Sequence, residues 1–143
     1  RLMSLLSEFD PDLELARAHT PPAGWYVDRD LAELEAEAVF ATTWQMVARV
    51  DQLGDAGDYV TAEIAGEQIV VVRDGDRLRA FYNVCRHRAA RLLDSDQGRC
   101  ERGRITCPYH GWTYDLHGRL IGVPRAQVNM STFPSTWPGW PAT

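Results

Sequence analysis

The chain has 143 residues and a mass of 16.1 kDa, the size of one domain with a buried core. With 45% hydrophobic and 24% charged residues, its composition excludes wholesale disorder and fibrous architectures. The net charge of −5 at pH 7 argues against a general nucleic-acid binder, which would normally carry clustered basic residues.

The sequence offers no signal for a membrane span or for secretion. Its longest unbroken aliphatic run, Ile69–Val72, is far shorter than the roughly 18 to 20 apolar residues that a spanning helix needs. The first residues contain no apolar stretch long enough for a secretory signal. Three cysteines are too few for a small disulfide-stabilised domain. We therefore expect a cytoplasmic protein whose cysteines serve metal or redox chemistry.

The charge is unevenly distributed along the chain. Residues 1–60 hold 4 Arg and 12 acidic residues, a net charge of −8, whereas residues 61–143 hold 11 Arg and 8 acidic residues, a net charge of +3. The most basic segment spans residues 86–104. On charge alone, we interpret it as a solvated loop slightly more readily than as a binding surface. This segment contains six arginines: Arg86, Arg88, Arg91, Arg99, Arg102 and Arg104.

Residues 1–43 are predicted to form an N-terminal arm and one helix. Residues 1–24 are acidic and then Pro-rich, which is typical of an extended or only partly helical segment. Asp30 with Glu33 resembles a capping box, and apolar residues recur at helical spacing from there to about Thr42. This pattern predicts one amphipathic helix.

From Trp44 onward the apolar period changes to two, which is typical of β-strands. Short runs rich in Val, Ile, Tyr and Thr alternate with Gly and Asp turns, as antiparallel hairpins do. We therefore expect a mainly β domain over residues 44–124, followed by an irregular tail with Pro and Trp over residues 125–143. The predicted strands cover residues 44–50, 58–64, 67–73, 78–84, 104–106, 113–116 and 119–123.

Two motifs place one thiol and one imidazole directly after a predicted strand. Cys85 and His87 follow the run 78–84, and Cys107 and His110 follow the run 104–106. Two Cys and two His can hold a tetrahedral zinc ion, or a [2Fe–2S] cluster with both thiolates on one iron and both imidazoles on the other. Because a zinc finger usually has a Cys pair followed by a His pair, the mixed loops favour a site in which each loop contacts both metals.

The motifs and their neighbours resemble the N-terminal Rieske [2Fe–2S] domain of Rieske non-haem iron, ring-hydroxylating type oxygenase large subunits. Asn83–Arg88 and Cys107–Asp115 carry the resemblance, which extends from about Trp44 to Pro124. It implies a Rieske-type antiparallel β-sandwich with two cluster-binding loops. It also implies one [2Fe–2S] cluster as the cofactor, with one iron bound by each pair of ligands: Cys85 and Cys107, His87 and His110.

Other residues of the two loops fit this interpretation. Pro108 and Gly111 suit a rigid, tight second loop. Tyr109 and Trp112 can wall the site with apolar surface, which influences the reduction potential. Ala89 stands where the family usually has Gly.

The loops also indicate the subgroup. Respiratory-chain Rieske proteins carry an extra Cys in each loop and a Ser after the second-loop Gly, where this chain has Ala90, Tyr109 and Trp112. An oxygenase-type centre is therefore expected. Residues 125–143 contain no His, Asp or Glu, so they cannot supply the two His and one carboxylate that hold the oxygenases' mononuclear iron. We expect a chain that transfers single electrons, lacks the catalytic domain and is not a complete mono- or dioxygenase.

Three functions stay open on the sequence. The leading one is the electron-transfer domain of an oxygenase large subunit; the others are a stand-alone Rieske ferredoxin-like carrier and a structural Cys2His2 zinc module. The resemblance implies a reductase or ferredoxin as electron donor and a catalytic iron domain in cis or in trans, and it allows a homotrimer in a full-length form. It implies no nucleic-acid or membrane partner and leaves the substrate open.

The remaining candidate residues receive structural interpretations. Cys100 is predicted to be a spare thiol at the surface or half-buried, His117 a solvent-facing turn residue, and His19 a residue without a partner. Arg99 and Arg102 are predicted to contribute to a face that docks an acidic electron donor. Three aromatic residues are predicted to pack in the core or on the helix: Trp25, Tyr26 and Trp44.

Overall fold

The computed structural model describes residues 2–124. The chain divides into two compact units, one built by residues up to Gln45 with the turn 64–66, and the other by residues from Met46 to Glu63 and from Glu67 onward. Among residues 2–124, none of the helices has the length and apolarity required to cross a bilayer. The predicted tail, residues 125–143, lies outside the described residues.

The first unit is helical. It contains α1 (Leu2–Leu6), a 3-10 turn η1 (Ala23–Tyr26), α2 (Arg29–Glu35) and a π-helical turn η2 (Ala36–Phe40). The α2 helix begins two residues earlier than predicted because Asp28, not Asp30, is its N-cap. Asp28 Oδ1 accepts a hydrogen bond from the Leu31 amide at 3.1 Å.

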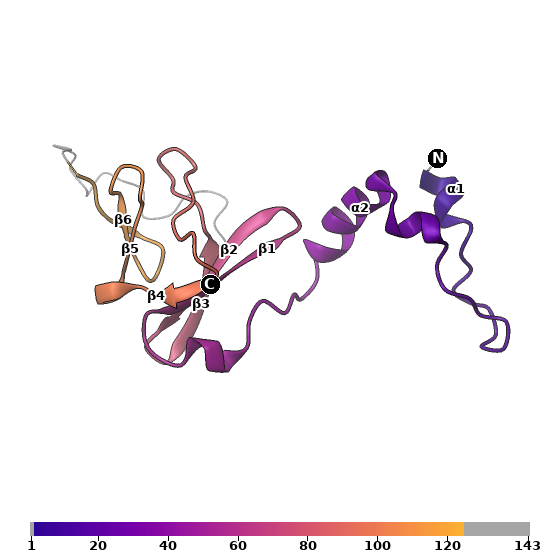
Figure 1. The fold of residues 1–143 in the computed structure, drawn as a ribbon, viewed down its shortest axis with the longest axis horizontal. Helices are drawn as coiled ribbons and strands as arrows, with labels where there is room; N and C mark the ends of the chain where they lie inside the picture. The colour runs from indigo at the N-terminus through magenta and orange to yellow at the C-terminus, as the bar shows by residue number, and fades with distance from the viewer. Residues whose placement is uncertain (1, 125–143) are drawn as a thin grey trace. The chain divides into compact units, whose positions relative to one another are not determined.

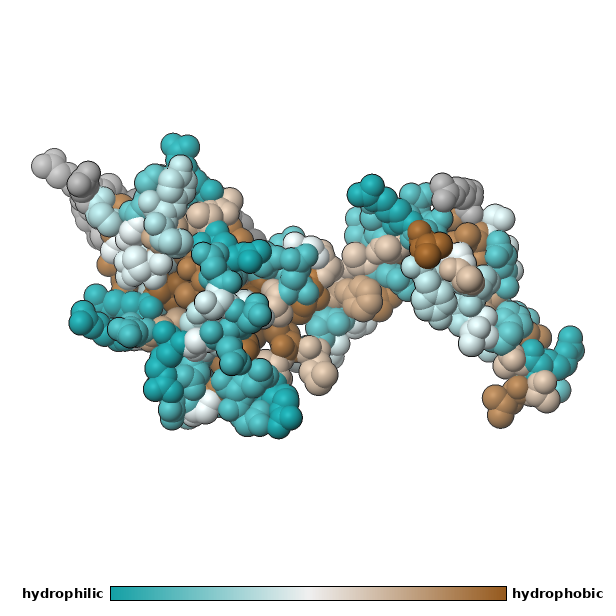
Figure 2. Space-filling view, viewed as in Figure 1, coloured by the Kyte–Doolittle hydropathy of each residue, from teal (hydrophilic) through white to brown (hydrophobic). Residues whose placement is uncertain are grey.

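Few side chains of residues 2–45 are buried within this unit, and only Leu31 is fully so. Trp25 donates its indole N–H to the Leu5 carbonyl at 2.9 Å and packs edge-on against Phe9. His19 also has a partner, since its ring contacts that of Phe9. The prediction that all three aromatic residues pack inside is wrong for two of them, because Tyr26 is 75% exposed and Trp44 is fully exposed. Figure 2 shows that hydrophobic residues, drawn in brown, also lie at the surface of the molecule.

The second unit is built from two antiparallel sheets (Figure 1). The four-stranded sheet has the order β3-β2-β1-β4, formed by β1 (Asp58–Ile64), β2 (Glu67–Asp74), β3 (Arg77–Tyr82) and β4 (Gln97–Arg99). The three-stranded sheet has the order β5-β6-β7, formed by β5 (Arg104–Thr106), β6 (Thr113–Asp115) and β7 (Leu120–Gly122). The expected fold class, a mainly antiparallel β domain preceded by a helix, is confirmed.

Two local predictions in this unit are wrong. Residues 44–50 form no strand, and the chain instead makes a 3-10 turn, η3 (Val50–Leu53). Strand β4 was not predicted, since it has three residues and a central glycine. That glycine, Gly98, is required because a Cβ there would lie 2.8 Å from the Tyr59 hydroxyl oxygen.

The alternation of side chains along β2 explains the core. Val70 and Val72 point into a cluster that contains residues of both sheets, together with Cys85 and Cys107. Val71 points to the opposite face, where it packs with Leu53 and Val60, so the segment before β1 covers that face although it is not a strand. Cys100 is a core residue, only 6% exposed, rather than the surface or half-buried thiol that was predicted.

Candidate metal centre

The two motif loops, residues 85–90 and 107–112, have the same pattern of backbone hydrogen bonds. In the first, the Cys85 amide donates to the Ala90 carbonyl and the Ala89 amide donates to the Cys85 carbonyl. In the second, the Cys107 amide donates to the Trp112 carbonyl and the Gly111 amide donates to the Cys107 carbonyl. Each cysteine therefore begins a tight turn whose fifth residue must adopt a positive φ, 53° at Ala89 and 71° at Gly111.

Both cysteines lie at the buried base of their loops. Cys85 and Cys107 are each 2% exposed, carry free thiols and belong to the same core cluster. Their position follows from the strands that precede them, because β3 and β5 deliver the chain from the sheets directly into the loops.

Both histidines lie at the exposed tips of the loops, which stand at the same end of the domain (Figure 1). The ring centroids of His87 and His110 are 4.7 Å apart. Trp112 stacks on His87 at 4.7 Å with an interplanar angle of 7°, and the Tyr109 ring lies 3.8 Å from that of His110. The structure thus places the two aromatic residues against the imidazoles, each covering one ring.

The surroundings of His87 favour the neutral form of its imidazole. Desolvation, followed by the electrostatic influence of the neighbouring His110 and Arg88, lowers the pKa of His87 below its usual value. A histidine binds a metal through a neutral ring nitrogen, so this shift favours the form that can act as a ligand.

Tyr114 reaches the first loop from strand β6 of the second sheet. Its hydroxyl oxygen lies 3.3 Å from Cys85 Sγ and accepts a hydrogen bond from the Arg86 amide at 3.1 Å. Burial, and then the neighbouring Cys85, raise the pKa of Tyr114, so its hydroxyl keeps its proton and can donate it toward the sulfur. The sequence assigned no role to Tyr114 because the contact joins residues 29 positions apart.

Asn83 braces the base of the first loop. It is fully buried, and its side-chain amide donates to the Leu93 carbonyl at 2.7 Å while its carbonyl oxygen accepts from the Leu93 amide at 2.9 Å. This paired contact closes the segment between residues 83 and 93 and thereby fixes both ends of the first loop. Asn83 is part of the motif, but its bracing role was not predicted.

The arginine-rich segment is only partly available for docking. Arg99 pairs with Asp55 at 2.6 Å and with Asp58 at 2.7 Å. The hydrogen bond from Arg99, followed by that from the Asp55 amide, lowers the pKa of Asp58 below its usual value. Arg99 therefore has a structural role joining β4 to β1, and its part in a docking face stays a prediction. Arg102 is exposed.

His117 is less isolated than predicted. Its side chain is 38% exposed, and Nε2 lies 3.2 Å from Asp74 Oδ2. The ring thus joins the β6–β7 turn to the end of β2, and it is not simply a solvent-facing residue.

The residues present fit a two-metal cluster. Two buried thiols and two adjacent imidazoles come from matched loops, and a Rieske [2Fe–2S] cluster takes two Cys on one iron and two His on the other. Within residues 2–124, no three His, Cys, Asp or Glu side chains are grouped so that they could hold one metal ion.

Comparison with known proteins identifies the domain. Residues 43–134 match the Rieske [2Fe-2S] domain family. The carnitine monooxygenase oxygenase subunit of Escherichia coli (strain K12) is 44% identical over 139 residues, which cover 91% of this chain and 36% of the relative. The chloroplastic choline monooxygenase of Arabidopsis thaliana is 40% identical over 125 residues, covering 87% of this chain and 29% of the relative.

A solved structure agrees with these relatives. A quaternary ammonium Rieske monooxygenase in complex with gamma-butyrobetaine superposes with a TM-score of 0.71 and 42% identity, covering 82% of this chain and 33% of that one. The chain spans about a third of the length of the relatives that it matches. From the family match and these relatives, we conclude that the chain belongs to the Rieske [2Fe–2S] domain family, in its oxygenase large-subunit branch, and carries one Rieske-type cluster.

Proposed function

We propose that this chain transfers single electrons as the Rieske domain of a monooxygenase oxygenase subunit. Cys85 and Cys107 are proposed to bind one iron, and His87 and His110 the other. The observation that carries this proposal is the matched pair of loops, which bury both thiols and bring the two imidazoles to a centroid distance of 4.7 Å. The bound cluster would supply a one-electron store.

The chain's own residues would protect and tune that store. The core around the cysteines excludes water from the sulfur side, and the Tyr114 hydroxyl is placed to donate a hydrogen bond to Cys85. Hydrogen bonds to the sulfurs and burial set the potential of such a centre. The exposed edges of His87 and His110 would provide the route by which an electron enters or leaves.

The domain boundaries are proposed as residues 1–43 for the arm and helix, 44–124 for the cluster domain and 125–143 for the tail. The family match from residue 43 and the compact β unit from Met46 support the first boundary. Oxygen activation is proposed to reside in a catalytic iron domain that this sequence does not cover, supplied with electrons by a reductase or a ferredoxin. A cytoplasmic location stays a prediction from the sequence.

For the parent oxygenase we infer a quaternary ammonium substrate. Carnitine, choline and gamma-butyrobetaine, the compounds in the names of the similar proteins, all carry a quaternary nitrogen. The test is oxygen consumption by the parent oxygenase with choline or carnitine against a neutral analogue that has carbon in place of the nitrogen. Equal rates with both would contradict a quaternary ammonium specificity.

The ligand assignment is tested by the iron and acid-labile sulfide content of protein purified without oxygen. The wild-type chain should hold about two iron and two sulfide, and Cys85→Ala or Cys107→Ala should lose the cluster. His87→Ala and His110→Ala should do the same.

The chain supplies its own matched controls for this experiment. Cys100→Ala removes a buried thiol, and His19→Ala an imidazole of the N-terminal unit, both outside the proposed ligand set, so both variants should retain the iron and sulfide of the wild type. Stoichiometric zinc without sulfide in the wild-type protein would contradict the proposal.

A further inference from the structure

The β6–β7 turn, residues 115–119, is a rigid element between the two sheets. The Asp115 carboxylate accepts hydrogen bonds from the amides of His117 and Arg119, each at 2.9 Å. Gly118 is buried and has a φ of 75°, which a residue with a Cβ rarely adopts. The turn is thus held by hydrogen bonds among its own residues.

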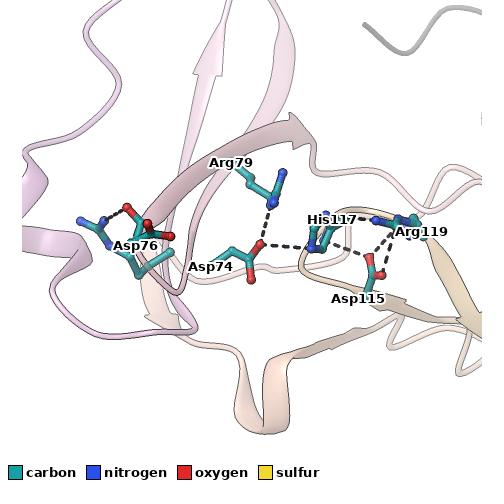
Figure 3. A network of polar contacts seen from close by, with 7 residues as sticks. Asp74, Asp76, Arg79, Asp115, His117 and Arg119 are labelled. Atoms are coloured by element: carbon teal, nitrogen blue, oxygen red, sulfur yellow. Dashed lines mark hydrogen bonds and ion pairs between the residues drawn. The ribbon is translucent and has the colours of Figure 1, made fainter. Parts of the chain in front are cut away.

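One side of this turn is held by the four-stranded sheet (Figure 3). Asp74 Oδ2, at the end of β2, contacts His117 Nε2 at 3.2 Å and Arg79 Nε at 2.6 Å. On the other side of the same ring, Arg119 Nη2 lies 3.3 Å from His117 Nδ1. A guanidinium can only donate, so Nδ1 accepts and Nε2 carries the proton that is donated to Asp74. Both ring nitrogens therefore have hydrogen-bond partners, and His117 fixes the turn to β2.

The other side of the turn contacts the first cluster loop through Arg86. Arg86 Nη2 donates to the Gly118 carbonyl at 3.4 Å. The backbone amide of the same residue donates to the Tyr114 hydroxyl, which lies 3.3 Å from Cys85 Sγ. Arg86 is half-buried between these contacts, whereas Arg88, on the other side of His87, is exposed.

We propose that Arg86 is a positioning residue for the cluster and that the turn 115–119 is its support. Its amide satisfies the acceptor side of the Tyr114 hydroxyl, which leaves the hydroxyl proton to point at the sulfur. Its guanidinium holds the loop segment between Cys85 and His87 against a turn that Asp74 ties to the other sheet. This inference rests on the proposed ligand roles of Cys85 and His87.

If Arg86 positions the cluster loop, its loss should have a different effect from the loss of a positive charge near the cluster. An arginine next to the cluster would raise the potential simply through its positive charge, and Arg88 would do so equally well. The Arg86 side chain donates a hydrogen bond to the turn, so its loss should loosen the loop. Arg88→Ala is therefore the matched control, because it removes one positive charge at the same distance in sequence from His87.

The experiment compares Arg86→Ala, Arg86→Lys, His117→Ala and Arg88→Ala in the whole chain. It measures the rate of iron loss to a chelator, the EPR spectrum of the reduced protein, and amide hydrogen exchange of residues 84–91. Arg86→Ala should lose iron about tenfold faster than the wild type, broaden the EPR spectrum and exchange faster, because outer contacts of a metal ligand contribute about 10- to 100-fold to its affinity.

The other variants separate the causes. Arg86→Lys should recover part of the iron retention, and His117→Ala should accelerate exchange in the same segment to a smaller degree. Arg88→Ala should match the wild type in iron loss and in exchange. If Arg86→Ala does not fold, Arg86→Lys tests the contact between Arg86 and the turn, and His117→Ala tests the support of that turn.

Two results would overturn the proposal. One is an Arg86→Ala variant indistinguishable from Arg88→Ala in all three measurements, and the other is a His117→Ala variant with unchanged exchange over residues 84–91. Hydrogen exchange also separates this inference from the proposed function. A wild-type chain without iron and sulfide would reject the ligand assignment, while faster exchange in Arg86→Ala would still support the positioning role.

Discussion

At the scale of single residues, the sulfur of Cys85 differs from that of Cys107 in its surroundings. A tyrosine hydroxyl lies 3.3 Å from Cys85 Sγ, and this hydroxyl is itself fixed by a backbone amide. A hydrogen bond to a thiolate stabilises the more negative, reduced state of a cluster more than the oxidised state. Tyr114 is therefore expected to raise the reduction potential.

Tyr114→Phe tests this effect directly. Losing the hydrogen bond should destabilise the reduced state by about 1 kcal/mol, which lowers a one-electron potential by on the order of 50 mV. The measurement is a redox titration of the purified domain. Tyr109→Phe serves as the control, since this tyrosine is 63% exposed and packs its ring on His110. Equal potentials for the wild type and Tyr114→Phe would show that the hydroxyl does not act on the sulfur.

A second residue-scale feature is the inert third thiol. Burial raises the pKa of the Cys100 thiol to about 11, so at neutral pH it is neither a thiolate nor accessible. Metal ligation and reactivity both require the thiolate. Cys100 is thus a small apolar core residue, which is why it suits the role of a control for the two proposed ligands.

At the scale of elements, the two loops adopt the same tight turn with different residues at its fifth position. Each turn needs a positive φ at its fifth position, and the second loop uses a glycine where the first uses Ala89. A residue with a Cβ pays about 1–2 kcal/mol for the left-handed region. A Cβ on Gly111 would in addition lie 2.9 Å from Pro124 Cγ.

Reciprocal substitutions should therefore have opposite effects. Ala89→Gly should leave the free energy of unfolding unchanged or raise it by up to about 1 kcal/mol, because the relief of strain exceeds the added chain entropy. Gly111→Ala should lower it by about 1–2 kcal/mol or more. Urea unfolding with iron retention checks both variants. A destabilised Ala89→Gly would indicate that the Ala89 methyl group contributes packing that outweighs its strain.

At the scale of the whole molecule, charged pairs connect elements that are distant in the chain. Hydrogen bonding from Arg79, aided by the positive charges of Arg79 and Arg77, lowers the pKa of Asp74 below its usual value of 3.8. A lowered pKa in the folded state means that the carboxylate stabilises the fold above pH 3.8, and that this contribution is lost as the pH falls through the lowered value.

Asp74→Asn should therefore reduce the thermal stability at about pH 7, and the deficit relative to the wild type should shrink toward about pH 3. Thermal unfolding followed by circular dichroism at both pH values provides the measurement. Asp76→Asn removes a carboxylate from the exposed β2–β3 turn and is the control. A deficit that stays constant across this range would mean that the Asp74 charge contributes nothing.

The docking of an electron donor also belongs to this scale. The sequence predicts that Arg99 and Arg102 contribute to the docking face. Because Arg99 also pairs with Asp55 and Asp58, Arg102 gives the cleaner test of this prediction. Arg102→Glu should slow reduction by an acidic donor at low salt, mainly through the association rate, and added salt should diminish the difference.

Arg17→Glu changes the net charge equally, but in the N-terminal unit, and should leave that rate nearly unchanged. Stopped-flow reduction kinetics distinguish the two variants. Identical rates and salt dependences would favour the solvated-loop interpretation of the arginine-rich segment.

The sequence by itself determined the antiparallel β class, the hairpins from Asp58 to Tyr82 and the two Cys/His motifs, because side-chain alternation, turn residues and ligand spacing are local signals. The sequence misplaced the N-cap of α2, predicted a strand at residues 44–50 and missed β4. The conformation of such short segments depends on the residues that they pack against, which local patterns do not reveal.

Only the tertiary structure decided which residues surround the two loops. Tyr114, Asn83 and the turn at His117 act across separations of 10 to 43 residues, and no local pattern in the sequence encodes those contacts. The same holds for Cys100 and Arg99, whose roles depend on a core and a neighbouring strand rather than on sequence spacing. Local chemistry thus predicts the ligands, while the packing of two sheets determines what holds them in place.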